Sequence, residues 1–127
     1  MTTKLDWNSG LVKHLGIRFV ETDKDRVVAE LEIKPELLTT TGALHGGTLM
    51  AFADTVGAAG TVVNLAAGQN TATLESKTNF IAGCREGTLQ AEARPIHKGK
   101  RTHVWETRIT DQSGKLLSIT TQTQMIL

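Results

Sequence analysis

The sequence predicts an α+β domain in which a twisted antiparallel sheet wraps around one long central helix. Residues 46–67 are mostly apolar or small, which fits one buried helix, and Gly68 is placed to end it. The segments before and after this stretch alternate between apolar and polar residues or are rich in β-branched residues, as strands are. A sheet that curls around the helix would cover it on most sides.

Before the long helix, the clearest strand signal is an alternation of apolar and polar residues from Val27 to Lys34, which Pro35 ends. A period of two is typical of a half-buried strand. The elements expected in this half are a short helix or irregular arm, two strands and a loop, at residues 3–14, 17–21, 27–34 and 37–44.

After the helix, every segment is predicted to be a strand. Short turns separate these segments, and Asp-Gln-Ser-Gly at residues 111–114 is a strong hairpin signal. Regular spacing with tight turns indicates antiparallel neighbours. The strands are expected at residues 71–81, 88–97, 102–110 and 116–126.

The composition predicts one cytoplasmic domain covering residues 1–127. The 14 basic and 13 acidic side chains nearly cancel, whereas a nucleic-acid-binding domain needs a basic excess. Cys84 is the only cysteine, so no intrachain disulfide can form, as in a reducing compartment. Residues 1–13 lack the apolar core of a signal peptide.

Residues 48–67 are also long enough to span a membrane. Asp54 would cost about 2.5–3.5 kcal/mol at the centre of a bilayer, and basic flanking residues are missing. We therefore interpret the segment as a buried central helix and expect no membrane partner.

Asp54 is the only formally charged side chain in residues 37–74. A carboxylate in an apolar helix is unfavourable unless it is paired or hydrogen-bonded, so a chain that keeps one usually uses it. His-Gly-Gly at residues 45–47 stands just before the helix, where backbone N–H groups have no partner within the helix. Donors together with a carboxylate suggest attack on a polarised carbonyl group.

The spacing of these groups predicts a shared site. Gly46 and Asp54 are eight residues apart, which is roughly 12 Å of helical rise. One carbonyl cannot touch both groups on the same helix, so the catalytic interpretation implies a symmetric dimer with two sites. The Gly46 N–H would bind the carbonyl oxygen, and Asp54 would act as general base or nucleophile. His45 would hold the loop or contact the substrate.

Each residue also has a structural interpretation. Two glycines before a helix are common in turns, and a lone histidine such as His45 is more often a structural hydrogen-bonding group than a catalyst. Asp54 could pair with a buried arginine or cap another helix. The conjunction of these residues at this spacing favours the functional interpretation.

Leu44-His45-Gly46-Gly47, followed by Asp54 and a Gly/Ala-rich helix, resembles the hotdog-fold acyl-CoA thioesterases, and most closely their phenylacetate-degradation subgroup. The likeness extends to the last strands, at residues 98–101, 104–106, 111 and 114–116. It implies a hotdog fold and hydrolysis of an acyl- or aryl-CoA to free acid and coenzyme A. No metal or separate cofactor is expected, since coenzyme A is part of the substrate. The expected minimal unit is a dimer, and the expected full assembly is a homotetramer formed by two such dimers.

The resemblance also implies roles for single residues. Gly46 matches the carbonyl-polarising donor, Asp54 the catalytic acid and His45 the loop histidine. Thr73 matches a Ser/Thr that helps to place the water in some members, and whether it reaches the site depends on which face of its strand is directed at the partner helix. Several members have Asn six residues before the histidine, where this chain has the shorter Thr39. The candidate substrate-binding residues are Thr39, Gly47, Lys98, Gly99, Lys100 and Arg101.

The basic turn at residues 98–101 has two interpretations. It is either a solvated hairpin or a clamp for the phosphates of coenzyme A, in which Lys and Arg supply charge and Gly99 lets the backbone approach. The resemblance favours the clamp, and Arg85 is a weaker candidate for the same role.

Other functions remain open from the sequence. A non-catalytic acyl-CoA-binding or sensing domain would share the fold, as would an oligomer in which Asp54 is only structural. A hotdog dehydratase would need a histidine-led pattern that the chain lacks. The chain has no Tyr, three Phe and two Trp, so aryl, short-chain and medium-chain thioesters are all possible substrates.

Overall fold

The computed structural model describes residues 6–127 of the chain. All six predicted strands and the long helix are confirmed, and the N-terminal segment contains a short helix, although residues 3–5 of that prediction lie outside the described part. The elements in chain order are α1 (Gly10–Leu15), β1 (Arg18–Asp23), β2 (Arg26–Glu32), the 3-10 helix η1 (Pro35–Leu37), α2 (Gly46–Asn64), β3 (Thr71–Phe80), β4 (Thr88–Lys98), β5 (Thr102–Thr110) and β6 (Leu116–Ile126).

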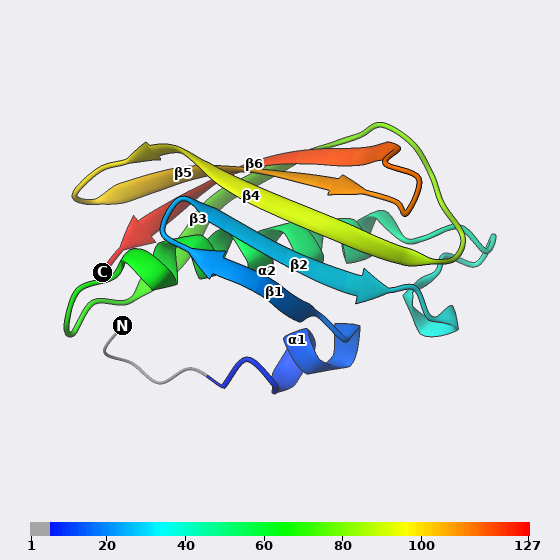
Figure 1. The fold of residues 1–127 in the computed structure, drawn as a ribbon, viewed down its shortest axis with the longest axis horizontal. Helices are drawn as coiled ribbons and strands as arrows, with labels where there is room; N and C mark the ends of the chain where they lie inside the picture. The colour runs from blue at the N-terminus through cyan, green and yellow to red at the C-terminus, as the bar shows by residue number, and fades with distance from the viewer. Residues whose placement is uncertain (1–5) are drawn as a thin grey trace.

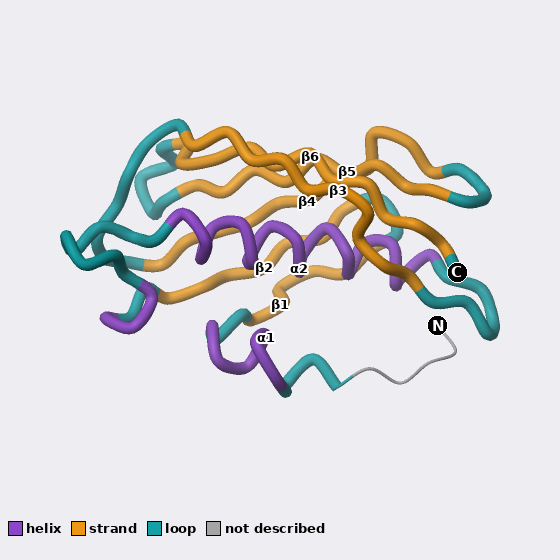
Figure 2. The backbone as a smooth tube through the Cα atoms, turned by 180° about the vertical axis from the view of Figure 1, so that it is seen from behind, coloured by secondary structure: helices purple, strands orange, loops and turns teal. Residues whose placement is uncertain are grey.

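The strands form one antiparallel sheet in the order β1-β2-β4-β5-β6-β3. Helix α2 runs along the inner face of the twisted sheet, and α1 lies beside it near β1 (Figures 1 and 2). The two edges of the sheet are therefore β1 and β3, on opposite sides of α2. This is the sheet wrapped around a central helix that the sequence predicts.

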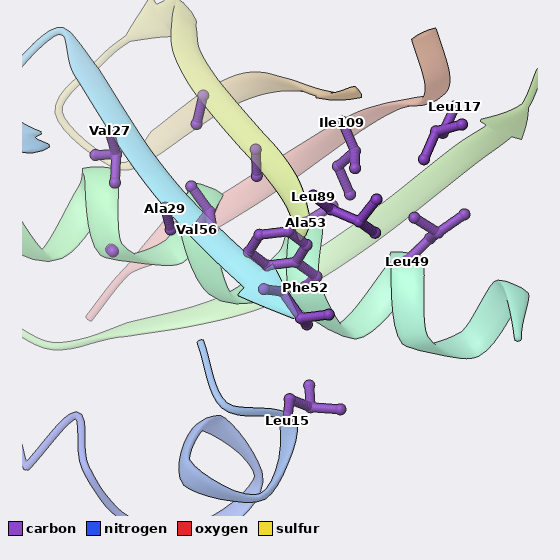
Figure 3. Close-up of a cluster of buried hydrophobic side chains, with 14 of the residues drawn as sticks. Leu15, Val27, Ala29, Leu49, Phe52, Ala53, Val56, Leu89, Ile109 and Leu117 are labelled. Atoms are coloured by element: carbon purple, nitrogen blue, oxygen red, sulfur yellow. The ribbon is translucent and has the colours of Figure 1, made fainter. Parts of the chain in front are cut away.

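The core lies between α2 and the middle of the sheet. Phe52, Ala53 and Val56 of the helix are fully buried and face the inward side chains of β2 and β4, as Figure 3 shows. Burying each of the larger apolar side chains stabilises the fold by roughly 1.5–3 kcal/mol. Apolar burial of one helix face therefore fixes α2 on the sheet. The inward apolar residues of β2 and β4 are Val27, Ala29, Leu31, Leu89, Ala91 and Ala93.

Helix α2 ends at Asn64, three residues before the predicted end. The Asn64 side chain donates hydrogen bonds to the backbone oxygens of Gly60 (2.8 Å) and Lys24 (2.9 Å), and Leu65 is already extended. A side chain that bonds the backbone in this way competes with continued helix. No helix within residues 6–127 is long and apolar enough to cross a membrane.

Candidate active site

The first turn of α2 leaves one backbone donor available. His45 is the N-cap: its Nδ1 accepts from the Gly47 N–H at 2.7 Å, and its backbone oxygen accepts from Thr48 and Leu49. Within the described residues, the Gly46 N–H has no hydrogen-bond partner. The His45 side chain thus caps the first turn of α2, and its role toward a substrate stays a prediction. The available donor points out at the positive end of the helix dipole.

An apolar cavity of about 370 Å³ opens beside Gly46. The Phe80 ring lies so close that a Cβ at Gly46 would be 3.1 Å from two of its atoms, so a larger residue there would displace the ring. Cys84 is half-buried in the wall, and burial, with a smaller contribution from Asp111, raises the pKa of its thiol, which stays neutral. Within residues 6–127, no charged side chain lines the cavity, whose wall is made by Leu44, Gly46, Leu49, Phe80, Ile81, Ala82, Gly83 and Cys84.

The Asp54 carboxylate is half-buried and is held by two neutral donors. The Thr73 hydroxyl donates to Oδ1 at 2.8 Å, and Gln122 Nε2 donates to the same oxygen at 3.0 Å. No Lys, Arg or His side chain in residues 6–127 forms an ion pair with Asp54. The structural alternative of a buried arginine partner therefore does not apply to the described chain.

A β-bulge turns Thr73 toward the helix. The pairing of β3 with β6 shifts between Thr73 and Glu75, so Leu74 is an extra residue in β3. Simple alternation would put Thr73 and Ser76 on opposite faces, but the bulge puts both opposite inward residues of β6. Thr73 thus reaches Asp54, a question that the sequence left open.

The sequence analysis missed Gln122 and Gln124 of β6. Both side chains are buried on the inner face of the sheet, and Gln124 Nε2 donates to Thr73 Oγ1 at 2.6 Å. A signal existed: residues 120–124 are an uninterrupted run of Thr and Gln without charge, which is unusual in a strand with neighbours on both sides.

Thr39 binds within its own loop. Its hydroxyl is 2.8 Å from that of Thr41, and its backbone bonds Ala43 and Gly42. Arg85 Nη1 donates to the Thr41 oxygen at 3.1 Å, which ties a second predicted residue to the same loop. Both side chains therefore brace the segment that leads into α2.

In the described part of the chain, the basic turn contains one cation that forms an ion pair and two that form none. Lys98 Nζ pairs with Asp25 Oδ1 at 2.6 Å, which fastens the β4–β5 hairpin to the β1–β2 turn. Lys100 and Arg101 are exposed, and neither forms an ion pair with a described residue. The Gly99 N–H bonds the Thr102 oxygen at 2.9 Å, and a Cβ there would contact the His97 ring.

Residues 41–118, which include Gly46, Asp54 and Thr73, match the family model described as the thioesterase superfamily. A 1,4-dihydroxy-2-naphthoyl-CoA hydrolase of Listeria monocytogenes is 34% identical over 110 residues, covering 87% of this chain and 89% of the relative. The chain belongs to the thioesterase superfamily. The family and the activity named for this relative identify it as a thioester hydrolase.

Solved structures agree with this assignment. A thioesterase of Haemophilus influenzae superposes with a TM-score of 0.91 and 27% identity, covering 95% of this chain and 85% of that one. The PaaI protein of the Escherichia coli phenylacetic acid degradation operon superposes with a TM-score of 0.87 and 25% identity, covering 94% and 86%. The hotdog fold and the likeness to phenylacetate-degradation thioesterases are confirmed.

Proposed function

We propose that this chain hydrolyses the thioester of an acyl- or aryl-CoA to a free acid and coenzyme A. The observation that carries the proposal is that α2 presents both the Gly46 N–H, unpartnered among the described residues, and the oriented carboxylate of Asp54. The N–H binds the carbonyl oxygen and stabilises the negative charge that develops there when the carbon becomes tetrahedral. The helix dipole adds to this stabilisation.

Asp54 acts in one of two ways. As a general base, it takes a proton from a water whose oxygen attacks the carbonyl carbon; the C–S bond breaks and the thiolate leaves and is protonated. As a nucleophile, its carboxylate attacks the carbon and expels the thiolate, and water then hydrolyses the mixed anhydride. Both routes yield the acid and coenzyme A.

Two copies of the chain build each site. Gly46 and Asp54 belong to the same helix at roughly 12 Å separation, so one carbonyl cannot reach both. Asp54 bonds Thr73 on β3, which is an open edge of the sheet, and Leu74 on that edge is 57% exposed. Joining two copies at β3 with antiparallel helices would cover this edge and bring Gly46 close to Asp54 of the partner subunit. A dimer of dimers stays a prediction.

The substrate carries an uncharged, apolar acyl group. The cavity beside Gly46 has apolar walls and a neutral thiol, which suit such a group and disfavour a carboxylate or an ammonium group. An aryl acyl group agrees with the naphthoyl-CoA named for the Listeria relative. The nucleotide of coenzyme A would lie outside, where Lys100 and Arg101 offer unpaired charge to its phosphates.

Replacing Asp54 with Asn tests the catalytic role. Asn keeps an oxygen that can accept from Thr73 and Gln122, so the fold should be retained, but it cannot act as base or nucleophile. We expect kcat for acyl-CoA to fall by about 10²–10⁴-fold. The assay is coenzyme A release over a panel of acyl and aryl thioesters, with circular dichroism as the folding control. A folded variant with wild-type kcat would refute the assignment.

Mixing two inactive variants tests the shared site. Asp54→Asn and Gly46→Val are each expected to be inactive, but a mixed dimer contains one site with both native groups. Random exchange of subunits in a symmetric dimer should restore about one quarter of wild-type activity. Mass spectrometry would establish that exchange has occurred. Proven exchange without recovery of activity would exclude a site built from two subunits.

A further inference from the structure

Two hydrogen-bond donors converge on one oxygen of the Asp54 carboxylate. Thr73 Oγ1 lies 2.8 Å and Gln122 Nε2 lies 3.0 Å from Oδ1, and Gln122 Nε2 is also 3.2 Å from the backbone oxygen of Asp54. Among the residues that the structure describes, none donates to Oδ2. The two carboxylate oxygens are therefore inequivalent before any substrate binds.

The orientation of the Gln122 amide is determined by its surroundings. Its NH₂ group faces two acceptors on Asp54, so a flipped amide would place oxygen against oxygen. In the observed orientation Oε1 turns toward Gly57, where a Cβ would contact it. Oε1 is buried and has no hydrogen-bond partner in the described part of the chain. A buried oxygen without a hydrogen-bond partner lowers stability. The presence of Gln122 at this position is therefore explained by the hydrogen bonds that its Nε2 donates to Asp54.

A second glutamine orients the other donor. Gln124 Nε2 donates to Thr73 Oγ1 at 2.6 Å, which leaves the Thr73 hydroxyl hydrogen directed at Asp54. The Thr71 hydroxyl lies 3.0 Å from Gln124 Oε1 and 2.8 Å from the Met125 backbone oxygen, so these two acceptors share its one hydrogen. Both donors to Oδ1 are thus held by β6, one directly and one through Thr73.

We propose that Gln122 is a positioning residue that fixes the Asp54 carboxylate, so that Oδ2 is the oxygen that receives the proton of water or attacks the acyl carbon. The inference rests on the proposed function of Asp54 and adds which oxygen reacts and what holds it. A carboxylate that rotates freely would present its lone pairs at varying angles, and small misplacements of a reacting group lower the rate strongly.

Gln122→Met removes the donor while keeping a side chain of similar length, and Thr120→Val is the matched control. Thr120 lies two residues earlier on the same inward face of β6, is fully buried and bonds Thr78 (2.7 Å), not Asp54. We expect Gln122→Met to lower kcat by about 10- to 100-fold with KM within about twofold of wild type. Thr120→Val should keep wild-type kcat, although both variants lose a buried hydrogen bond.

A spectroscopic measurement tests the contact without relying on activity. The side-chain NH₂ signals of Gln122, identified by their loss in Gln122→Met, should exchange slowly with solvent and shift in Asp54→Asn but not in Thr120→Val. If wild-type protein released no coenzyme A, the proposed function would fail while this measurement still decided whether Gln122 holds Asp54. Equal kcat in Gln122→Met and Thr120→Val, or Gln122 signals that do not respond to Asp54→Asn, would overturn the positioning role.

Discussion

Helix α2 packs against two unlike halves of the same sheet. The inward residues of β2 and β4 are all apolar and nearly inaccessible to solvent. The buried residues of β6, at the other side of the helix, include the apolar Leu117 but are otherwise polar: Ser118, Thr120, Gln122 and Gln124. The two halves therefore do not differ in how deeply their side chains are buried, but in whether those side chains are apolar or polar.

The difference separates what holds the fold from what builds the site. The apolar half gains from transfer of its side chains out of water, but polar groups gain little from burial and lose when they lack partners. Four buried atoms in and beside the polar half have no hydrogen-bond partner among the described residues. The part of this surface that bonds the Asp54 carboxylate, the Gln122 amide, is explained by the proposed function. The four atoms are the hydroxyl oxygens of Ser76, Thr107 and Ser118 and Oε1 of Gln122.

Two glycines of α2 allow packing against an apolar ring, Trp105 of β5, to be compared with packing against a polar side chain, Gln122 of β6, within one helix. Gly60 faces the Trp105 ring, where a Cβ would lie 2.5–2.7 Å from ring atoms. Gly57, one turn earlier, faces the Gln122 amide. Trp105 is fully buried and rigid, whereas the amide is the end of a side chain with rotatable bonds. Gly60→Ala should therefore lower the free energy of unfolding by about 1–3 kcal/mol, as overpacking does.

Gly57→Ala should instead act on the reaction. The added methyl group would push the Gln122 amide away from Asp54, so we expect kcat to fall by about tenfold with a smaller loss of stability. Urea unfolding and kcat per folded molecule measure the two effects in both variants. If both alanines lowered stability alone, Gln122 would have a packing role like that of Trp105 and no role in the reaction.

The strands and the central helix could be predicted because their patterns are strong and local. Residues 27–34 alternate with a period of two, and residues 46–64 contain no break. The end of α2 was less predictable, because the bond of Asn64 to Lys24 depends on a turn far away in the sequence.

The site could be predicted only where its residues lie close in sequence. Gly46 and Asp54 stand out because one short stretch combines a Gly-Gly step with a lone carboxylate. Gln122 was missed because the apolar residues Ile119 and Met125 suggest the opposite face of β6 as the buried one. The reach of Thr73 depends on the bulge at Leu74, which no alternation pattern indicates.

A change outside both halves should affect neither chemistry nor stability. Lys100→Ala combined with Arg101→Ala should raise KM for acyl-CoA by about threefold to tenfold with kcat unchanged, since each of the two exposed charges contributes about 1 kcal/mol or less. Salt should weaken the effect, because the charges are exposed. Lys98→Ala is the control, since Lys98 pairs with Asp25.

A thioester without the nucleotide sharpens this test, because it offers no phosphates to Lys100 and Arg101. Its turnover should not respond to the double substitution. If KM for acyl-CoA stayed at the wild-type value at low salt, the turn would be a solvated hairpin and the nucleotide would bind elsewhere. If only Lys98→Ala raised KM, the paired cation would be the one that binds.

The smallest expected effect concerns a buried polar group that does not contact Asp54. His103 Nδ1 lies 3.1 Å from the Thr61 hydroxyl, and burial, followed by the charges of Lys98 and His97, lowers the pKa of His103 below its ordinary value of 6.5. Between the two pKa values the unfolded chain binds more protons than the folded one. Stability should therefore decrease as pH falls below about 6.5.

In His103→Gln this part of the pH dependence should vanish while kcat is retained, as urea unfolding from about pH 8 to about pH 5 would show. Unchanged pH dependence in the variant would mean that other groups account for it, and a loss of kcat would mean that the catalytic part of the polar half extends to β5.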